Sequence, residues 1–358
     1  MEKPYVNLKK TKEKDGEIAF EAELSAEATA EAEKEVLTEA GADFAAPGFR
    51  KGKAPEAMVR ERINPVELLE EAAHKALPDA IREIVREQAL STLGRPEVSV
   101  TKLAPASVET SAGKPGSLVA FTVRFSLMPE IGLPDYKSIA QKIVKEAKPV
   151  MVTQEEVDEA VKHLREMFRG SAEKEGGESL PELTDEIVKQ FGPYKNVPEF
   201  MEELKHSLTE GKGRDEKEKR REEMVQAIVA KTKIKIPALL VSQEFEAFLE
   251  NRDEELQKAG ISIEDYLKQV KKTEEEMEKE ERAAIEKQIA ASLVMGAMRK
   301  KENIAADEKD VSANIAALKR RYPDRTDAEL WEPAEAISIQ KKLFDILEGA
   351  EKAQEEKN

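Results

Sequence analysis

The sequence predicts a multidomain, mostly α protein in which an α+β N-terminal domain precedes an elongated, all-α C-terminal domain with helical arms. Three observations support this prediction. Apolar residues alternate in several segments of the first 130 residues, with helical patterns between them. Beyond residue 150, apolar residues recur only at the spacing of helices. Charged residues make up 37% of the chain and aromatic residues only 5%, which is typical of long, exposed helices.

The chain begins with a predicted β-hairpin and a helix. Apolar residues alternate from Ile18 to Leu24, after a turn at residues 14–16, as expected for a hairpin with one buried face. Ser25 can cap the helix that follows, and Gly41 can end it.

The rest of the N-terminal domain, which we expect to span residues 1–128, combines two helices with a second hairpin. Pro55 suits the first turn of a short helix. Residues 64–90 begin with a capping Asn-Pro pair and follow a helical pattern, and Pro78 should kink or split this helix. Alternation returns in residues 98–127, around a Gly-Lys-Pro-Gly turn.

Residues 129–179 are predicted to form a connector made of a strand, a helix and a short polar linker. Weak strand character covers Ile139–Val144. Thr153 and Glu156 have the spacing of a capping box, which predicts the start of a helix. The polar linker runs from residue 169 to residue 179.

Residues 180–358 are predicted to form the all-α C-terminal domain. The expected helices carry Phe200 to Leu208, Leu240 to Leu249, Ile263 to Val270, Thr273 to Lys301, Lys309 to Arg321 and Asp327 to Leu347. The fourth of these is the longest, roughly 44 Å at 1.5 Å per residue. Its first half is nearly all Glu and Lys, and its second half is apolar.

Composition and motifs exclude several classes of function. A net charge of −16 disfavours general binding to nucleic acid, because like charge repels phosphate. Cysteine is absent and the three histidines are scattered singly, so we expect no metal site. Since no phosphate-binding loop or nucleophile motif occurs, we expect no cofactor and no catalytic residues. The N-terminus lacks a hydrophobic signal core and no apolar run could span a membrane, which predicts a cytoplasmic protein without a membrane partner.

A short loop near residue 50 combines an unusual backbone with an aromatic residue and cations. Gly48 and Gly52 permit backbone angles that other residues resist. Phe49 cannot easily be a core residue, because Arg50 and Lys51 follow it directly. One interpretation is an ordinary basic surface loop with a single exposed aromatic. The other is a docking tip, in which a hydrophobic anchor is flanked by cations that pair with an anionic surface.

This loop resembles the ribosome-binding signature of trigger factors, in the form Gly48-Phe49-Arg50-x-x-Lys53-x-Pro55. Trigger factors are bacterial chaperones that sit at the nascent-chain exit of the large ribosomal subunit. The resemblance implies a ribosome-binding domain over residues 1–128 and an ATP-independent chaperone activity. It also implies two docking partners, a ribosomal protein beside the exit tunnel and nearby ribosomal RNA. The ribosome-binding residues that it implies are Gly48, Phe49, Arg50, Lys51 and Lys53.

The resemblance further implies that the C-terminal domain, residues 180–358, binds unfolded nascent polypeptides. Such a domain needs dispersed apolar patches, and flexible thioethers adapt to varied partners. Apolar stripes at helical spacing are nevertheless more often core than binding surface. Off the ribosome, family members can self-associate, so a homodimer is a further expected partner. The residues that we expect to contact clients are Met224, Leu293, Met295 and Met298.

Most trigger factors carry an FKBP-type prolyl isomerase domain at the position of the polar linker. Such a domain needs an apolar, aromatic pocket for the proline ring, and residues 169–179 cannot supply one. We therefore expect a trigger factor without its isomerase domain, and not an enzyme. The alternatives are a ribosome-independent holdase or helical adaptor, which salt-sensitive ribosome binding would exclude, and a divergent prolyl isomerase.

Overall fold

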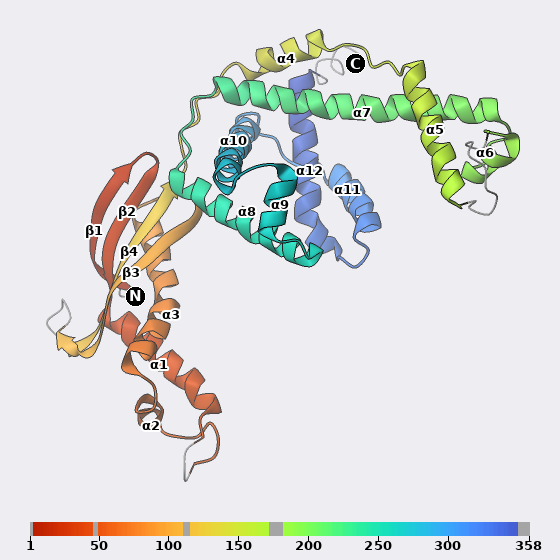
Figure 1. The fold of residues 1–358 in the computed structure, drawn as a ribbon. Coiled ribbons are helices and arrows are strands. Elements are labelled where there is room, and N and C mark those ends of the chain that lie inside the picture. Colours follow the sequence, from red (N-terminus) through yellow and green to blue (C-terminus); the bar gives the residue numbers. More distant parts are fainter. Residues whose placement is uncertain (1–2, 46–48, 110–114, 172–181, 350–358) are drawn as a thin grey trace. The chain divides into compact units, whose positions relative to one another are not determined.

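The computed structural model is mostly α, with an α+β N-terminal domain followed by an all-helical C-terminal region (Figure 1). The structure describes residues 3–45, 49–109, 115–171 and 182–349. The predicted fold class is confirmed in these residues. None of their helices is both long enough and apolar enough to cross a lipid bilayer.

The chain divides into two compact units, and each unit is made from two separate stretches of sequence. Unit 1 comprises Met1–Ile131 and Ile234–Ser292. Unit 2 comprises Gly132–Lys233 and Leu293–Asn358. The helical C-terminal region therefore contributes to both units.

Unit 1 holds the strands that the structure describes and two groups of helices. The strands are β1 (Tyr5–Lys14), β2 (Glu17–Leu24), β3 (Thr92–Glu109) and β4 (Pro115–Leu127). The helices of the first group are α1 (Ala26–Asp43), α2 (Glu56–Arg60) and α3 (Pro65–Glu87). The helices of the second group are α8 (Ala238–Ala259), α9 (Ile263–Val270) and most of α10 (Glu274–Lys301).

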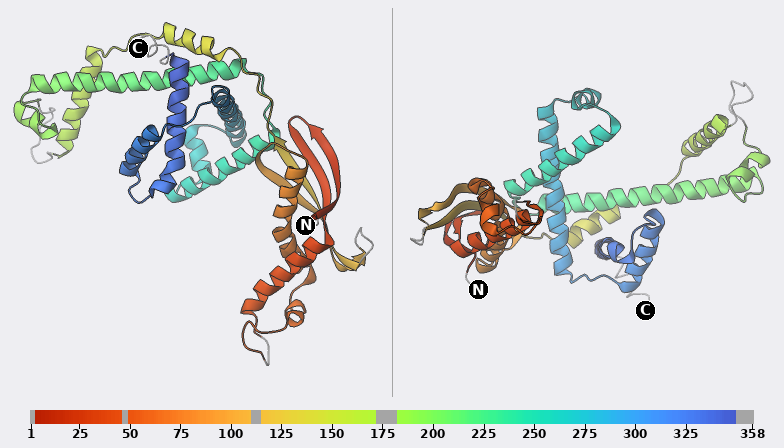
Figure 2. Two further views of the ribbon diagram at one scale, coloured as in Figure 1. Left: turned by 180° about the vertical axis from the view of Figure 1, so that it is seen from behind. Right: turned by 90° about the horizontal axis from the view of Figure 1, so that it is seen from below.

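The four described strands form one antiparallel sheet in the order β1-β2-β4-β3. β1 and β2 make the predicted first hairpin, whose turn places Asp15 and Gly16 at positive φ angles of 60° and 80°. β3 and β4 make the second hairpin, but residues 110–114 of its turn lie outside the described residues. α3 covers one face of the sheet, and the main hydrophobic core lies between them (Figure 2). Its deeply buried members include Phe20, Leu69, Ile84, Phe121 and Val123.

The ends of the N-terminal helices agree only partly with the sequence prediction. Ser25 caps α1 by accepting a hydrogen bond from the backbone N–H of Ala28 at 3.1 Å. Gly41 does not end α1, which continues for two more residues before the N–H of Phe44 bonds the Gly41 carbonyl. Pro78 does not split α3, which is one helix because its residues on both sides of the proline pack into the core.

The regular elements of unit 2 are all helices in the part of the chain that the structure describes, apart from an isolated bridge between Gly132 and Lys233. They are α4 (Tyr136–Glu146), α5 (Gln154–Ser171), α6 (Asp185–Phe191), α7 (Val197–Lys231), the end of α10, α11 (Glu308–Arg321) and α12 (Asp327–Glu348). α5 begins with the predicted capping box, in which the N–H of Thr153 donates to Glu156 at 2.8 Å. It extends over the first three residues of the predicted linker, and residues 172–181 lie outside the described part.

The predicted strand at Ile139–Val144 is wrong, because these residues belong to α4. Asp135 caps this helix by accepting a hydrogen bond from the N–H of Ser138 at 3.2 Å. Tyr136 and Ala140 are buried on one face, at the spacing of a helix turn. A short apolar run fits a strand and a helix equally well, and the cap and the burial decide for the helix.

Charged side chains connect the helices of unit 2. Arg221 of α7 donates to Glu348 of α12 at 2.8 Å, and its guanidinium lies 4.7 Å from the centroid of the Phe344 ring. Glu302, next to the end of α10, accepts hydrogen bonds from Tyr136 and from Lys137 of α4. These contacts join segments that lie far apart in the sequence.

Candidate functional site

The predicted docking loop joins α1 to α2 within unit 1 (Figure 1). Phe49 is apolar, yet 44% of its surface is exposed. Arg50, Lys51 and Lys53 are exposed as well. Gly48 lies outside the described residues. The structure therefore brings together one exposed aromatic ring and three cations within five residues.

The backbone of the docking loop depends on a glycine. Gly52 has a φ of +76°, and its N–H donates to the carbonyl oxygen of Phe44 at 3.1 Å. A Cβ atom at this position would lie 2.8 Å from the carbonyl oxygen of Ala42. The N–H of Lys53 donates to the carbonyl oxygen of Arg50 at 2.9 Å, which closes a tight turn. Only glycine suits residue 52 without strain, as the sequence predicted.

A small hydrophobic cluster supports the docking loop, separate from the main core of unit 1. Its centre consists of Leu37 of α1, Val59 of α2 and Leu68 of α3, which are 1%, 1% and 3% exposed. Phe44 and Ala54, at the two ends of the loop, pack against it. The loop is thus fixed at both ends, while its aromatic tip stays in solvent.

Some of the cations around the loop form ion pairs with carboxylates, and others do not. Lys51 pairs with Asp43 at 2.8 Å, and both side chains are largely exposed. Arg60 pairs at 3.0 Å with Glu33, a buried carboxylate. Arg50 and Lys53 form no ion pair with a described residue. These two cations and the Phe49 ring are therefore free to meet a partner.

The N-terminal domain also bonds to α8 within unit 1. The N–H of Leu239, at the start of α8, donates to the buried carboxylate of Glu17 at 2.9 Å. One turn later, Gln243 bonds both main-chain groups of Arg95: it accepts from the N–H at 3.2 Å and donates to the carbonyl at 2.7 Å. Sequence reasoning missed these residues, because partners 148 and 222 residues apart leave no local signal.

A further ion pair and a cleft lie where the N-terminal domain contacts the segment around the start of α8. Lys235 bonds Asp15 in the turn of the first hairpin, and this hydrogen bond lowers the pKa of the carboxyl below its ordinary value of 3.8. A cleft of about 1070 Å³ opens beside these residues, between the strand ends and α8. Cations and carboxylates both line it, and the carboxylates outnumber the cations.

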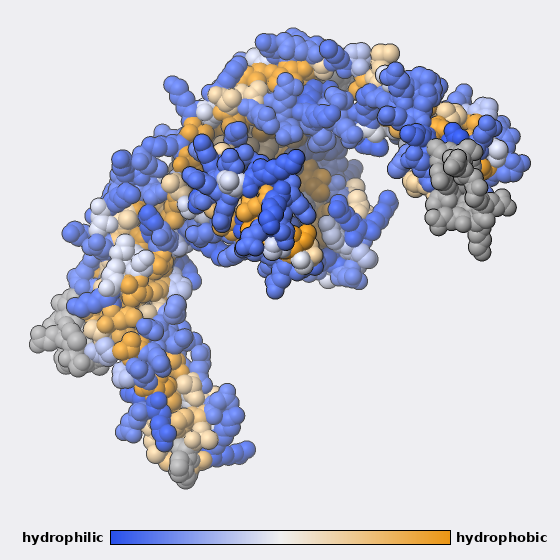
Figure 3. All heavy atoms as spheres, in the orientation of Figure 1, coloured by the Kyte–Doolittle hydropathy of each residue, from blue (hydrophilic) through white to orange (hydrophobic). Residues whose placement is uncertain are grey.

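The predicted client contacts divide into buried and half-buried residues. Met224 and Met298 are fully buried, so in this structure they pack inside unit 2 and cannot touch a client. Leu293 and Met295 are half-buried. Elsewhere, hydrophobic residues show through a mostly hydrophilic surface in separate patches (Figure 3). Among the described residues of unit 2, the large exposed apolar ones are Met151, Met167, Tyr322, Trp331 and Ile337.

Comparison with known families decides the relationship. The family model described as "Bacterial trigger factor protein (TF)" matches residues 6–164, and "Bacterial trigger factor protein (TF) C-terminus" matches residues 196–333. The chain belongs to the trigger factor family. The docking loop lies within the first matched segment, which identifies the trigger factor N-terminal domain. Between the two trigger factor domains, no FKBP-type domain is matched.

Individual relatives agree with this assignment. The trigger factor of Carboxydothermus hydrogenoformans is 25% identical over 385 residues, which cover 83% of this chain and 84% of that protein. The trigger factor of Streptomyces coelicolor is 24% identical over 363 residues, which cover 78% and 75% of the two chains.

A solved structure described as "Promiscuous Substrate Recognition in Folding and Assembly Activities of the Trigger Factor Chaperone" superposes with a TM-score of 0.55. The match covers 96% of this chain and 99% of that chain at 15% identity. At this identity, the likeness between the two structures concerns the fold alone.

Proposed function

We propose that this member of the trigger factor family is an ATP-independent chaperone that docks on the large ribosomal subunit and shelters nascent polypeptides. The carrying observation is the exposed Phe49 ring beside Arg50 and Lys53, two cations without an ion pair among the described residues. The trigger factor N-terminal domain that contains this loop supports the proposal.

Each side chain of the docking loop has a distinct proposed role. Phe49 supplies an apolar anchor for a ribosomal protein beside the tunnel exit, since burial of an aromatic side chain yields about 1.5–3 kcal/mol. Arg50 and Lys53 pair with carboxylates or with phosphates of nearby ribosomal RNA. Lys51 can exchange Asp43 for a partner group at little cost, because an exposed ion pair contributes about 0–1 kcal/mol. Gly48 completes the proposed signature.

Co-sedimentation with ribosomes tests the docking proposal. The variant Phe49→Ala, Arg50→Ala, Lys51→Ala should fail to co-sediment, with its unfolding curve unchanged. The matched control is Arg320→Ala, Arg321→Ala, Tyr322→Ala, which also removes one exposed aromatic and two cations but lies in unit 2. This control should bind ribosomes like the wild type. Equal binding by the docking-loop variant would refute the proposed site.

The proposed binding of unfolded chains depends on many weak apolar contacts. Leu293 and Met295 remain proposed contacts, because both are partly accessible. Replacing both by Ser should reduce the ability of the chain to suppress aggregation of a denatured protein. Unchanged suppression would exclude these two residues as client contacts.

We also propose that the chain lacks prolyl isomerase activity and acts in the cytoplasm, with self-association off the ribosome. The support for the first part is that only the N-terminal and C-terminal trigger factor domains are matched. A refolding assay limited by proline isomerisation provides the test, and catalytic acceleration by the chain would contradict the proposal. Sedimentation velocity over a range of concentrations tests self-association.

A further inference from the structure

The joined end of α11 and α12 carries a second group of exposed aromatic and cationic side chains. Arg320 and Arg321 end α11, and Tyr322 is its C-cap residue. Tyr322 is 46% exposed, and Trp331, in the second turn of α12, is 47% exposed. We call these four residues the arm tip.

Trp331 lies on α12, the helix that follows the cationic end of α11. Asp327, in the first turn of α12, forms an ion pair with Lys319, in the last turn of α11. Trp331 follows Asp327 by four residues and therefore shares its face of the helix. The tryptophan thus lies one helical turn along α12 from the ion pair between Lys319 and Asp327.

Ion pairing leaves two guanidinium groups of the arm tip available. Lys319 is occupied by Asp327, and Arg325 pairs with Glu329 at 3.2 Å. Arg320 and Arg321 form no ion pair with any residue in the described ranges. The guanidinium of Arg321 lies 5.7 Å from the centroid of the Tyr322 ring, which presents a cation and an aromatic face together.

Helix energetics explain only part of this arrangement. The helix dipole favours cations in a last turn, which accounts for Arg320 and Arg321. It does not account for Tyr322 and Trp331, two large aromatic side chains that remain half in water. Arginine, tyrosine and tryptophan are the residue types that dominate binding energy at protein interfaces.

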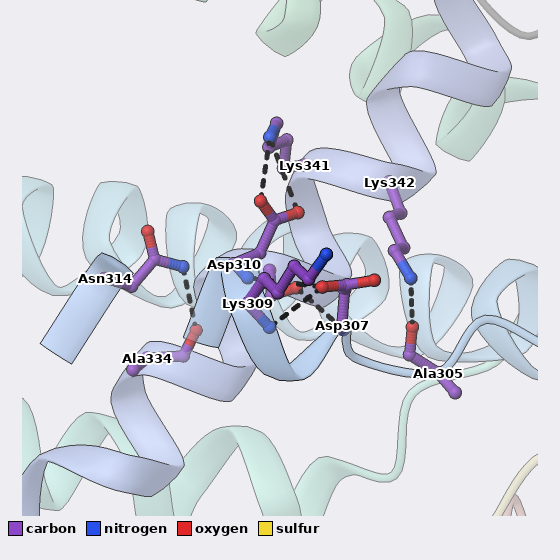
Figure 4. A network of polar contacts seen from close by, with 9 residues as sticks. Ala305, Asp307, Lys309, Asp310, Asn314, Ala334, Lys341 and Lys342 are labelled. Atoms are coloured by element: carbon purple, nitrogen blue, oxygen red, sulfur yellow. Dashed lines mark hydrogen bonds and ion pairs between the residues drawn. The ribbon is translucent and has the colours of Figure 1, made fainter. Parts of the chain in front are cut away.

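Polar contacts between α11 and α12 hold together the helical hairpin that carries the arm tip (Figure 4). A small core of Val311, Ile315, Leu330 and Ala334 joins the two helices. Asn314 donates to the carbonyl oxygen of Ala334 at 3.1 Å, and Lys341 pairs with Asp310 at 3.4 Å. Thr326 and Glu329 form a capping box that fixes the start of α12. A preorganised surface loses little conformational freedom when a ligand binds.

The charges around the arm tip decide which anionic ligand it fits. Two free guanidinium groups match one or two carboxylates or phosphates. Asp324, Asp327 and Glu332 are exposed close by, and the whole chain carries a net charge of −16. A polyanion such as RNA would be repelled by these carboxylates along most of its length. A short peptide with few carboxylates and neighbouring apolar side chains would not.

We propose that the arm tip binds short polypeptide segments in which acidic residues neighbour apolar or aromatic ones. Arg320 and Arg321 bind the carboxylates, and Tyr322 and Trp331 cover the apolar side chains. This inference rests on the proposed chaperone function, and it adds a class of client segment that a strongly acidic chain would otherwise repel. The docking loop plays no part in it.

Binding of labelled peptides to the full chain tests the inference. The probes are a fluorescein-labelled peptide in which glutamate alternates with leucine and phenylalanine, and two analogues with serine or lysine in place of glutamate. We expect the glutamate peptide to bind about tenfold more tightly than the lysine peptide at low salt. It should also shift the emission of Trp331, the single tryptophan of the chain.

Two variants distinguish peptide binding at the arm tip from a general effect of the positive charge of the chain. Arg320→Ala, Arg321→Ala, Tyr322→Ala should weaken binding of the glutamate peptide by about tenfold. Lys189→Ala, Lys205→Ala removes the same positive charge from exposed positions of unit 2 and should leave binding unchanged. Ribosome co-sedimentation should be normal in both variants.

Three results would overturn the inference. The first is equal binding of the glutamate peptide by the triple variant and the wild type. The second is equal affinity of the wild type for the glutamate and serine peptides. The third is tighter binding of oligouridylate that the same triple variant loses, which would make the arm tip a nucleic-acid site. If the wild type binds none of the peptides, the proposed client-binding function fails as well, whereas loss of ribosome docking alone leaves the inference intact.

Discussion

The docking loop and the arm tip use similar side chains on different supports. Phe49 precedes two cations in the docking loop, and Tyr322 follows two cations in the arm tip. The docking loop takes its shape from a left-handed glycine and a cluster of three helices. The arm tip is the end of a regular helix beside a capped second helix. A loop of one fixed shape suits one fixed partner, whereas open aromatic faces on a helix end suit many short segments.

The charges around the docking loop also differ from those around the arm tip. Within the docking loop, residues 49–55 hold three cations and no carboxylate. Around the arm tip, carboxylates alternate with cations and occupy two of them, Lys319 and Arg325. We therefore expect long anionic surfaces to fit the docking loop and to be repelled around the arm tip.

The largest expected effect comes from removal of the support beneath one of these regions. Leu37→Ala opens a cavity under the docking loop and should reduce the stability of unit 1 by about 2–5 kcal/mol, with a strong loss of ribosome binding. Urea unfolding and co-sedimentation measure the two effects. Leu330→Ala, in the core beneath the arm tip, is the matched change and should leave ribosome binding intact. Normal docking by Leu37→Ala would show that the loop does not need its cluster.

A backbone change comes next in size. Gly52→Ala places a Cβ atom 2.8 Å from a main-chain oxygen at a φ of +76°, which should cost about 1–3 kcal/mol and weaken ribosome binding. Gly213→Ala is the control, because its Cβ atom would meet nothing within 4 Å and it lies inside α7. The control should be slightly stabilised. Equal ribosome affinity of both variants, measured by co-sedimentation, would contradict the backbone account of the docking loop.

Loss of a helix cap should affect only the arm tip. Thr326→Ala removes the capping box of α12 and should cost about 1 kcal/mol. Amide hydrogen exchange in the first turn of α12 should accelerate, and binding of the glutamate peptide should fall severalfold. Thr326→Ser keeps the hydroxyl group and should restore both. Reduced ribosome binding by Thr326→Ala would show that the docking loop and the arm tip do not act independently.

The smallest expected effect is a pH dependence of the same cap. Hydrogen bonds from the backbone and side chain of Thr326 hold the pKa of Glu329 below its ordinary value of 4.5. A lowered pKa in the folded state means that this carboxylate stabilises the chain above pH 4.5, and that the contribution disappears as the pH falls through the folded value. Glu329→Gln should therefore be less stable than the wild type at pH 7 and approach it in acid. Trp331 fluorescence during urea unfolding measures the difference, and a gap that stays constant with pH would exclude this role.

Much of the fold, including the docking loop, could be predicted because its signals are local. The alternation from Ile18 to Leu24, the Thr153 capping box and Gly52 each depend on residues a few positions apart. Local signals failed for α4, where a short apolar run fits a strand as well as a helix. They also failed for Met224 and Met298, because helical spacing does not say whether an apolar face meets the core or a client.

Neither the attachment of α8 nor the arm tip was predicted, for different reasons. Glu17 and Gln243 depend on partners that only the folded chain brings close. Arg320, Arg321 and Tyr322 stand side by side in the sequence, so the adjacency of cations and an aromatic was visible there. What the sequence could not show is which nearby cations are occupied by carboxylates, since that depends on how α11 and α12 meet.

The hydrogen bond between Glu17 and Leu239 limits how early unit 1 can fold while the chain is being synthesised. The two residues are 222 positions apart, so about 10–45 s separate their translation at about 5–20 residues per second. During that interval the carboxylate of Glu17 has no helix to cap, and its described ion-pair partner is Arg124 of β4 at 3.9 Å. Unit 1 cannot close before residue 292 has been made, and unit 2 closes later still because it includes α11 and α12. Each unit therefore stays incomplete until its second stretch of sequence has been made.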